Sequence, residues 1–240
     1  MNLKVLILTT ETIHHAFFIQ NLLDNEVDVK AILEKKTGIF EHKSDLVLKT
    51  NDFEREFFFR GISHEINEMA SCLIVDNINS VEVHKYLGNN HFDICISFGV
   101  SWIKENTLSL LPTIKLNLHG GNIQNYRGLD SHLWSTYHLD ATGFLTTLHM
   151  LSPELDCGNI VQAGELDINQ ISELYMLRSI NTKMANHLVL NALNSVEKTG
   201  KLISIPQSGK GRYYSAMPTI LYERCESNFQ TLRNMRNTID

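Results

Sequence analysis

A side-chain amide and an imidazole lie two residues apart at the end of a short apolar run: Asn117 and His119, which Gly120 and Gly121 follow. A carboxylate, Asp156, comes later in the chain. An amide N–H stabilises the negative charge that develops on the oxygen of a tetrahedral intermediate. An imidazole beside a carboxylate moves protons in the same reaction. These three groups are what a site needs to transfer an acyl unit to an amine without a metal.

The alternation within residues 115–119 places the two polar groups together. Leu116 and Leu118 share one face of the expected strand, because side chains of a strand alternate between its faces. Asn117 and His119 then share the opposite face. Polar groups on a buried strand are costly unless they are paired or used. Ligands of α/β proteins bind at the carboxyl ends of parallel strands, which favours a role in a site over a core histidine bonded to a nearby loop.

Strand-like and helix-like segments alternate along the chain. Residues 3–9 form a buried apolar run, residues 13–23 have helical spacing, and residues 27–33 are rich in β-branched side chains. This opening predicts an α/β protein with a mostly parallel, twisted sheet flanked by helices. Further strands are expected at residues 73–75, 93–97, 114–118, 144–151 and 159–163, and helices at 53–70, 81–87, 102–110, 129–139, 171–198 and 219–239.

Two connecting regions define the domain organisation. Residues 35–52 are polar and are expected to form a flexible or substrate-facing loop. Gly200 follows the longest helical pattern, and a glycine at that place ends a helix well. Residues 201–240 are too few for an independent core. We therefore expect a catalytic domain over residues 1–200 and an extension over residues 201–240, made of a loop or hairpin and a helix that could contact a second subunit.

Composition excludes several classes of protein. The chain of 240 residues has a formal net charge of −6, which argues against a protein that coats nucleic acid. Its four cysteines include no CxxC pair, so neither a disulfide framework nor a zinc site is expected. The N-terminus has no cleavable signal pattern, and no apolar run approaches the roughly 18 residues that span a membrane. We expect a cytoplasmic protein that binds no nucleic acid, membrane or metal.

Three motifs in combination resemble a known family. Asn-x-His ends a strand, a loop closes on Tyr126-Arg127-Gly128, and Leu155-Asp156-Cys157-Gly158 follows. Together they resemble the folate-dependent formyltransferases, over about residues 1–200 in element order and residues 93–165 in motif detail. The resemblance implies a Rossmann-like formyltransferase fold, 10-formyltetrahydrofolate as co-substrate, no metal, and a homodimer.

The loop after the histidine narrows the resemblance. The enzymes that formylate methionyl-tRNA or a purine precursor usually continue with Pro-Ser-Leu-Leu-Pro, whereas residues 120–124 here are Gly-Gly-Asn-Ile-Gln. The chain is most similar to the nucleotide-sugar N-formyltransferases, which formylate an amino-dideoxy sugar on dTDP or GDP for bacterial surface polysaccharide such as O-antigen lipopolysaccharide. The substrate this implies best is dTDP-4-amino-4,6-dideoxyglucose.

The resemblance also implies catalytic roles for three residues. Asn117 would donate its side-chain N–H to the formyl oxygen, and His119 would assist proton movement around the tetrahedral intermediate. Asp156 would either orient His119 or accept protons through water from the attacking amine, and the sequence does not separate these two roles.

Cofactor and acceptor contacts are implied in the same way. The pterin would lie against the loop after the strand at residues 93–97 and against the Leu-Asp-x-Gly loop, that is, against Phe98, Gly99, Val100, Ser101, Trp102, Ile103 and Leu155. The alternative is a plain strand-to-helix turn with Trp102 in the core. The acceptor would contact Gly120, Gly121, Asn122, Tyr126, Arg127, Gly128, Asp130 and His132. Arg127 could instead pin its loop to a neighbouring carboxylate, and Asp130 could simply cap a helix.

Other histidines and other functions complete the set of expectations. His14 and His15 are expected to face a loop or solvent, and His149 to be a structural neighbour rather than a ligand. The rival enzymatic reading is formylation of methionyl-tRNA or a purine precursor, against which the acidic charge and the short stretch after Gly200 argue. A formyl-folate hydrolase is a weaker alternative. A non-catalytic folate- or nucleotide-binding module is the alternative from another class.

Overall fold

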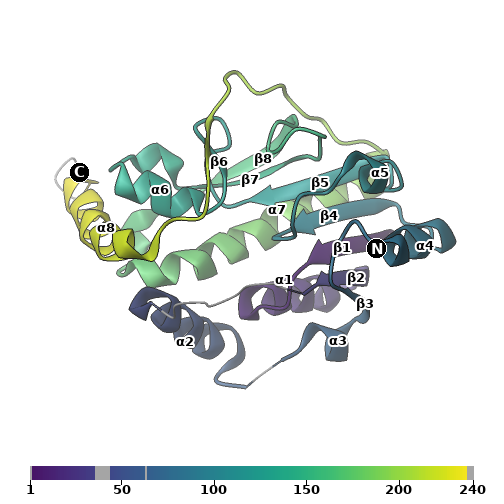
Figure 1. Cartoon of the computed structure of the whole chain (residues 1–240), viewed down its shortest axis with the longest axis horizontal. Helices are drawn as coiled ribbons and strands as arrows, with labels where there is room; N and C mark the ends of the chain where they lie inside the picture. Colours follow the sequence, from purple (N-terminus) through teal and green to yellow (C-terminus); the bar gives the residue numbers. More distant parts are fainter. Residues whose placement is uncertain (1, 36–43, 63, 237–240) are drawn as a thin grey trace.

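A computed structural model describes residues 2–35, 44–62 and 64–236. A seven-stranded sheet with strand order β3-β2-β1-β4-β5-β7-β8 forms the centre of the molecule (Figure 1). The first five strands of this order are parallel, and β7 and β8 run antiparallel to their neighbours. The strands are β1 (Lys4–Thr9), β2 (Asp28–Glu34), β3 (Ser71–Val75), β4 (Ile94–Phe98), β5 (Ile114–His119), β7 (Leu145–Met150) and β8 (Ile160–Glu165). The predicted α/β class with a mostly parallel sheet is confirmed.

Helices cover both faces of this sheet. On β1, Val5 and Ile7 join one apolar cluster while Leu6 and Leu8 join another, because both faces of a central parallel strand are buried. The first cluster packs against α1 (Ile13–Asp24) and α7 (Leu177–Thr199). The second packs against α4 (Val81–Asn89) and α5 (Glu105–Leu108). The remaining helices are α2 (Asp45–Phe59), α3 (Ile66–Met69), α6 (Ser131–Tyr137) and α8 (Tyr222–Arg236).

Two predicted boundaries differ from the structure. The expectation of a loop over residues 35–52 is wrong for its last part, because Ser44 caps α2 by accepting a hydrogen bond from the N–H of Val47. Residues 36–43 lie outside the described residues. The helix expected over residues 53–70 stops at Phe59, where Arg60 adopts a left-handed conformation with φ of 51°.

The long helix α7 ends where it was predicted to end. Gly200 adopts the left-handed conformation, with φ of 70°, and its N–H bonds to the carbonyl of Val196. The beginning was predicted too early, because residues 174–176 form a 3-10 turn before the α-helix starts at Leu177.

The segment after α7 returns across the molecule (Figure 1). Ile205 bridges to Ile160, and β9 (Arg212–Tyr214) pairs in parallel with β6 (Tyr126–Gly128), the short strand that follows the Gly-Gly loop. Helix α8 then packs its buried face, including Phe229, against α6 and the 3-10 turns at residues 168–170 and 174–176. Among the described helices, none combines the length and the apolar character that crossing a membrane requires.

Candidate functional site

Asn117 and His149 lie directly opposite each other on the neighbouring strands β5 and β7. Nδ1 of His149 lies 2.9 Å from the carbonyl oxygen of Met150, so this nitrogen carries the hydrogen and donates it. In the neutral ring, Nε2 then has the lone pair and accepts a hydrogen bond from Nδ2 of Asn117 at 3.0 Å. Asn117 is therefore held with its nitrogen toward His149, and its second N–H is left for another acceptor.

His119 is buried at the carboxyl end of β5. Its Nε2 donates a hydrogen bond to the carbonyl oxygen of Tyr126 at 2.8 Å, and its Nδ1 lies 3.5 Å from Oδ2 of Asp156. In the neutral ring Nδ1 carries no hydrogen, so the contact with Asp156 becomes a charge-assisted hydrogen bond only when His119 takes up a proton. This arrangement suits a group that accepts a proton.

Asp156 lies between the two imidazoles. Its Oδ2 accepts a hydrogen bond from the N–H of Gly128 at 2.7 Å, and its Oδ1 lies 3.6 Å from Nε2 of His149. The Asp156 backbone has a φ of 52°, in the left-handed region. The turn also requires Gly158, because a Cβ there would lie 1.6 Å from the carbonyl oxygen of Met150. The structure thus brings together the three residues predicted to be catalytic.

Burial and neighbouring charges set the protonation of the pair. Desolvation lowers the pKa of His119 below its ordinary value, although the Asp156 carboxylate opposes the change. Desolvation alone would raise the pKa of Asp156, but the contact with His149, the charge of His119 and the N–H of Gly128 together hold this pKa below its ordinary value. At neutral pH the pair is an uncharged imidazole beside a carboxylate, which is the state required of a general base.

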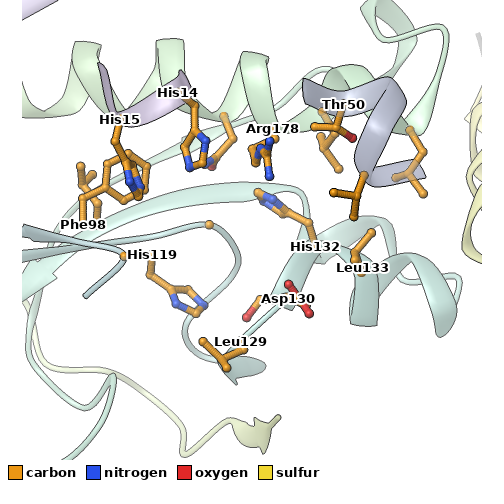
Figure 2. A pocket seen from close by; sticks show the side chains of 18 of the residues that line it. His14, His15, Thr50, Phe98, His119, Leu129, Asp130, His132, Leu133 and Arg178 are labelled. Atoms are coloured by element: carbon orange, nitrogen blue, oxygen red, sulfur yellow. The ribbon is translucent and has the colours of Figure 1, made fainter. Parts of the chain in front are cut away.

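A cavity of about 400 Å³ opens beside His119 (Figure 2). Its walls come from the first turns of α1, α6 and α7, from α2, and from the loops after β1, β4 and β5. The volume falls within the range of small-molecule sites. His119 lines this cavity, whereas Asn117 and Asp156 lie outside its wall.

The residues predicted to contact the pterin divide into two groups. Phe98 and Gly99 line the cavity; the Gly99 backbone has a φ of 79°, and a Cβ there would lie 2.6 Å from the His15 ring. Val100, Ser101, Trp102, Ile103 and Leu155 do not line it. The loop that carries most of this second group therefore faces away from the cavity.

Ser101 and Trp102 show how that loop is held. The backbone N–H and the hydroxyl of Ser101 both donate to the buried carboxylate of Glu34, each at 2.7 Å, which fixes the loop to β2. Trp102 is 63% exposed, so the alternative that placed it in the core is wrong. Leu155, from the Leu-Asp-x-Gly loop, is 42% exposed. Ile103, in contrast, is part of the core.

The residues predicted to contact the acceptor also divide. Those that line the cavity are Gly120, Gly128, Asp130 and His132; those that do not are Gly121, Asn122, Tyr126 and Arg127. Gly121 packs against Ser131, since a Cβ there would lie 2.6 Å from the Ser131 Cβ. Asn122 accepts a hydrogen bond from the N–H of Gln124 and shapes the turn. Asp130 makes no side-chain cap on α6; its Oδ2 accepts the N–H of Met217 at 2.8 Å instead.

Tyr126 and Arg127 are engaged in holding the loop. The hydroxyl of Tyr126 donates to Oδ2 of Asp140 at 2.8 Å. Arg127 is buried and donates to Oε1 of Gln207 at 2.6 Å and to the carbonyl of Gly209 at 3.3 Å. Arg127 Nη1 also donates to Sγ of Cys157 at 3.2 Å. Arg127 thus joins its loop to the extension and to the Leu-Asp-x-Gly turn, through acceptors other than the carboxylate that was considered.

Several cavity residues were missed in the sequence. His14 and His15 line the cavity and are 8% and 3% exposed, so the expectation that they face a loop or solvent is wrong. Arg178 and Asn181, one helical turn apart on α7, also line it. Their i, i+3 spacing at the start of a helix was the available signal. His149 was noticed as a strand residue, but nothing in the sequence pairs it with Asn117.

Among the residues that the structure describes, no group of three or more histidine, cysteine, aspartate or glutamate side chains is placed to hold a metal ion. No protein-family model matches the chain. It is 26% identical over 193 residues to the methionyl-tRNA formyltransferase of Borrelia hermsii, a match that covers 79% of this chain and 56% of that protein. The chain therefore spans little more than half the length of this relative.

Solved structures share the fold. A 4-N formyltransferase from Francisella tularensis superposes with a TM-score of 0.61 at 15% identity, over 88% of this chain and 76% of that one. The formyltransferase PseJ from Anoxybacillus kamchatkensis, in complex with UDP-4,6-dideoxy-4-formamido-L-AltNAc and tetrahydrofolate, superposes with a TM-score of 0.56 at 19% identity, over 95% and 97%. The fold is the Rossmann-like formyltransferase fold. The resemblance found in the sequence is thus confirmed for the fold.

Proposed function

We propose that the protein is a sugar N-formyltransferase, which moves a formyl group from 10-formyltetrahydrofolate to the amine of a nucleotide-linked amino-dideoxy sugar. The observation that carries this proposal is the meeting of Asn117, His119 and Asp156 beside a cavity of about 400 Å³. His149 links Asn117 to this group. The fold shared with sugar N-formyltransferases supports the acceptor class.

Each catalytic side chain has a defined task in this reaction. The free N–H of Asn117 donates to the formyl oxygen as its carbon becomes tetrahedral, where such a donor contributes most. His119 accepts, at Nδ1, the proton that the attacking amine loses when the new C–N bond forms. Asp156 stabilises the resulting imidazolium across the 3.5 Å contact. Collapse of the intermediate breaks the bond to the folate nitrogen, which takes up a proton, and leaves a formamide and tetrahydrofolate.

The charge of the cavity suits an uncharged sugar ring. Arg178 lines the cavity, but its guanidinium forms two hydrogen bonds to the fully buried carboxylate of Glu54, at 2.6 and 2.8 Å. His14 lies 3.5 Å from the same carboxylate. Since the positive charge of Arg178 is already compensated, we place the sugar in the cavity and the diphosphate of the nucleotide outside it.

The formyl donor is assigned to the other side of the catalytic group. Asn117 and Asp156 lie outside the cavity wall, and Trp102 and Leu155 expose apolar surface that a pterin ring could cover. The two substrates would then approach the tetrahedral centre from opposite sides. Of the predicted donor contacts we retain Val100, Ser101, Trp102 and Leu155, which lie outside the cavity wall, whereas Phe98 and Gly99 line the cavity and Ile103 belongs to the core.

The finer assignments are part of the proposal. We take dTDP-4-amino-4,6-dideoxyglucose as the best acceptor and surface-polysaccharide (O-antigen) synthesis in the cytoplasm as the setting. Residues 1–200 would form the catalytic domain. Residues 201–240 would form the extension, which could contribute to a homodimer.

The direct experiment is to incubate the protein with 10-formyltetrahydrofolate and 4-amino-4,6-dideoxyglucose linked to dTDP, GDP or UDP, and to detect the formamide by mass spectrometry. We expect formylation of at least one of the three and catalytic loss in Asn117→Ala. Absence of product with all three nucleotides would reject the proposed acceptor class.

Formylation of methionyl-tRNA is the second candidate, because the curated relative from Borrelia hermsii has that name. The same assay with charged initiator tRNA separates the two. A formylated methionyl-tRNA product, together with tRNA binding that weakens steeply with salt, would favour this candidate.

A further inference from the structure

Two polar side chains lie beside Gly120, the residue that follows His119. A Cβ built on Gly120 would lie 3.3 Å from Nδ2 of Asn181 and 3.4 Å from Cε1 of His132. Both residues line the cavity. The point next to Gly120 is thus flanked by an amide of α7 and an imidazole of α6, one residue away from the expected general base.

The orientation of the Asn181 amide is fixed from behind. The hydroxyl of Thr146, on β7, donates to Oδ1 of Asn181 at 2.7 Å. This bond engages Oδ1 and leaves Nδ2, with its two hydrogens, for another acceptor; both ends of the amide lie near Gly120, at 3.3 Å (Nδ2) and 3.5 Å (Oδ1) from a Cβ built there. Asn181 is only 5% exposed. Within the described parts of the chain, Nδ2 has no hydrogen-bond partner from the protein.

The His132 ring is fixed by Leu145, which precedes Thr146 on β7. Its Nε2 donates to the carbonyl of Leu145 at 2.7 Å, and the ring stacks on Phe144 with an interplanar angle of 11°. Burial lowers the pKa of His132 to about 4, so the ring is neutral near pH 7. Nδ1 then carries a lone pair, and no described protein group donates to it.

We propose that Asn181 and His132 determine acceptor specificity by binding one hydroxyl group of the sugar, the one on the carbon next to the amine. The hydroxyl oxygen accepts the N–H of Asn181, and its hydrogen is donated to Nδ1 of His132. A hydroxyl offers this combination of donor and acceptor, whereas an ammonium group or a phosphate oxygen offers one of the two. The inference depends on the proposed sugar N-formyltransferase function and names the residues that choose its substrate.

Asn181 and His132 both line the cavity, and within the described protein neither Nδ2 of Asn181 nor Nδ1 of His132 makes a hydrogen bond, so a ligand in the cavity can use both. Gly120 is what allows the ligand to reach them, since a side chain there would occupy the space between the two groups. β7 orients both groups, through Thr146 and through the carbonyl of Leu145. The hydroxyl is therefore bound at a place that is rigid relative to His119, and the amine on the next carbon is directed toward the formyl carbon.

The test compares dTDP-4-amino-4,6-dideoxyglucose with its 3-deoxy analogue, which lacks the hydroxyl next to the amine. Wild-type protein should prefer the hydroxylated acceptor roughly tenfold or more in kcat/KM. Asn181→Ala should reduce this preference to about twofold, mainly through a higher KM for the hydroxylated sugar.

Matched variants separate recognition from general damage. Asn186→Ala removes an amide from the same helix at a site that is 4% exposed and outside the cavity, and should leave the preference unchanged. His132→Gln keeps a donor near the Nε2 position and loses the Nδ1 acceptor, so it should lose the preference. His132→Asn keeps an acceptor near the Nδ1 position and should retain more of it. Thermal unfolding of each variant checks that it is folded.

The failures are distinguishable. If wild type formylates none of the dTDP-, GDP- or UDP-linked acceptors, the proposed function is rejected and this inference with it. If wild type is active but shows no preference, or if folded Asn181→Ala and His132→Gln keep the full preference, the inference about the hydroxyl is wrong while the proposed function stands.

Discussion

Nε2 of His149 accepts a hydrogen bond from Nδ2 of Asn117 at 3.0 Å, directly across the pair of strands β5 and β7. The bond decides which end of the amide faces the reacting carbon. We predict that His149→Phe lowers kcat about tenfold with little change in KM, because Asn117 stays in place but loses its fixed orientation. Steady-state kinetics measure this effect. His187→Phe, at an exposed histidine of α7, is the control; equal kcat in both variants would contradict the role of His149.

Removing the side chain of Asn117 or His119 should lower kcat more than His149→Phe does. Asn117→Ala should lower kcat by about 10² to 10³, the usual effect of deleting one donor to an oxyanion. His119→Ala should lower it about 10²-fold or more, because the amine then has no positioned proton acceptor. Single-turnover rates with folded variants measure both. Near wild-type rates in both variants would remove the proposed mechanism.

His132 makes the fold sensitive to acid. Its pKa is about 4 in the folded protein and 6.5 in its ordinary state, so between these values the unfolded chain binds a proton that the folded one does not. Stability must then fall as the pH falls from about 6.5 to about 4, by up to about 3 kcal/mol from this residue. The lowered pKa of His119 acts in the same direction. Asp156 contributes below its ordinary pKa of 3.8, where protonation of the carboxylate removes the stability it provides.

Urea unfolding at pH 6.5 and pH 4.5 measures this dependence. We predict that His132→Gln loses about 2 kcal/mol less than wild type over that interval, since one of the protons taken up on unfolding is absent. If both proteins lose the same unfolding free energy between pH 6.5 and pH 4.5, His132 does not contribute to the pH dependence of stability.

Gly158 limits how the turn that carries Asp156 can change. A Cβ at this position would lie 1.6 Å from the carbonyl oxygen of Met150, so Gly158→Ala must displace backbone. We predict a loss of more than about 2 kcal/mol of unfolding free energy, together with a lower kcat. Gly88→Ala is the control, because nothing lies within 4 Å of its added Cβ and the site is within α4. That variant should gain about 0.5–1 kcal/mol; equal stability changes would contradict the packing argument.

Substitution of Arg127 separates two roles, the anchoring of its loop and the binding of a phosphate. Its hydrogen bonds to Gln207 and Gly209 predict that Arg127→Met lowers the melting temperature and speeds proteolysis between residues 201 and 211. Arg212→Met, at an exposed arginine of the paired strand β9, should do neither. A higher KM for the nucleotide sugar without any loss of stability would instead assign Arg127 to phosphate binding.

The sequence predicted the parts of this molecule that depend on local periodicity. The alternation of apolar and helical runs gave the α/β class, and the Asn-x-His and Leu-Asp-x-Gly motifs located Asn117, His119 and Asp156, which the structure brings together. Gly200 was predicted to end α7 because a left-handed position favours glycine.

Contacts between distant segments could not be predicted in this way. His149 lies opposite Asn117 because β7 runs antiparallel to β5 in one particular register, which no single segment encodes. Asn181 and His132 both lie beside Gly120 because α7 and α6 both approach that residue. The guanidinium of Arg127 could bind a phosphate. Only the structure shows that residues 201–214 lie beside Arg127 and that its N–H donors are used within the protein.

The pairing of β9 with β6 has a consequence for the order in which the proposed site is completed during synthesis. The strand that gives its N–H to Asp156 and its carbonyl to His119 is completed by residues that leave the ribosome long after it does. A chain synthesised only as far as α7 contains all seven strands of the main sheet but lacks β9, the strand that pairs with β6. The loop that carries the proposed catalytic residues is therefore completed only when residues 212–214 pair with β6.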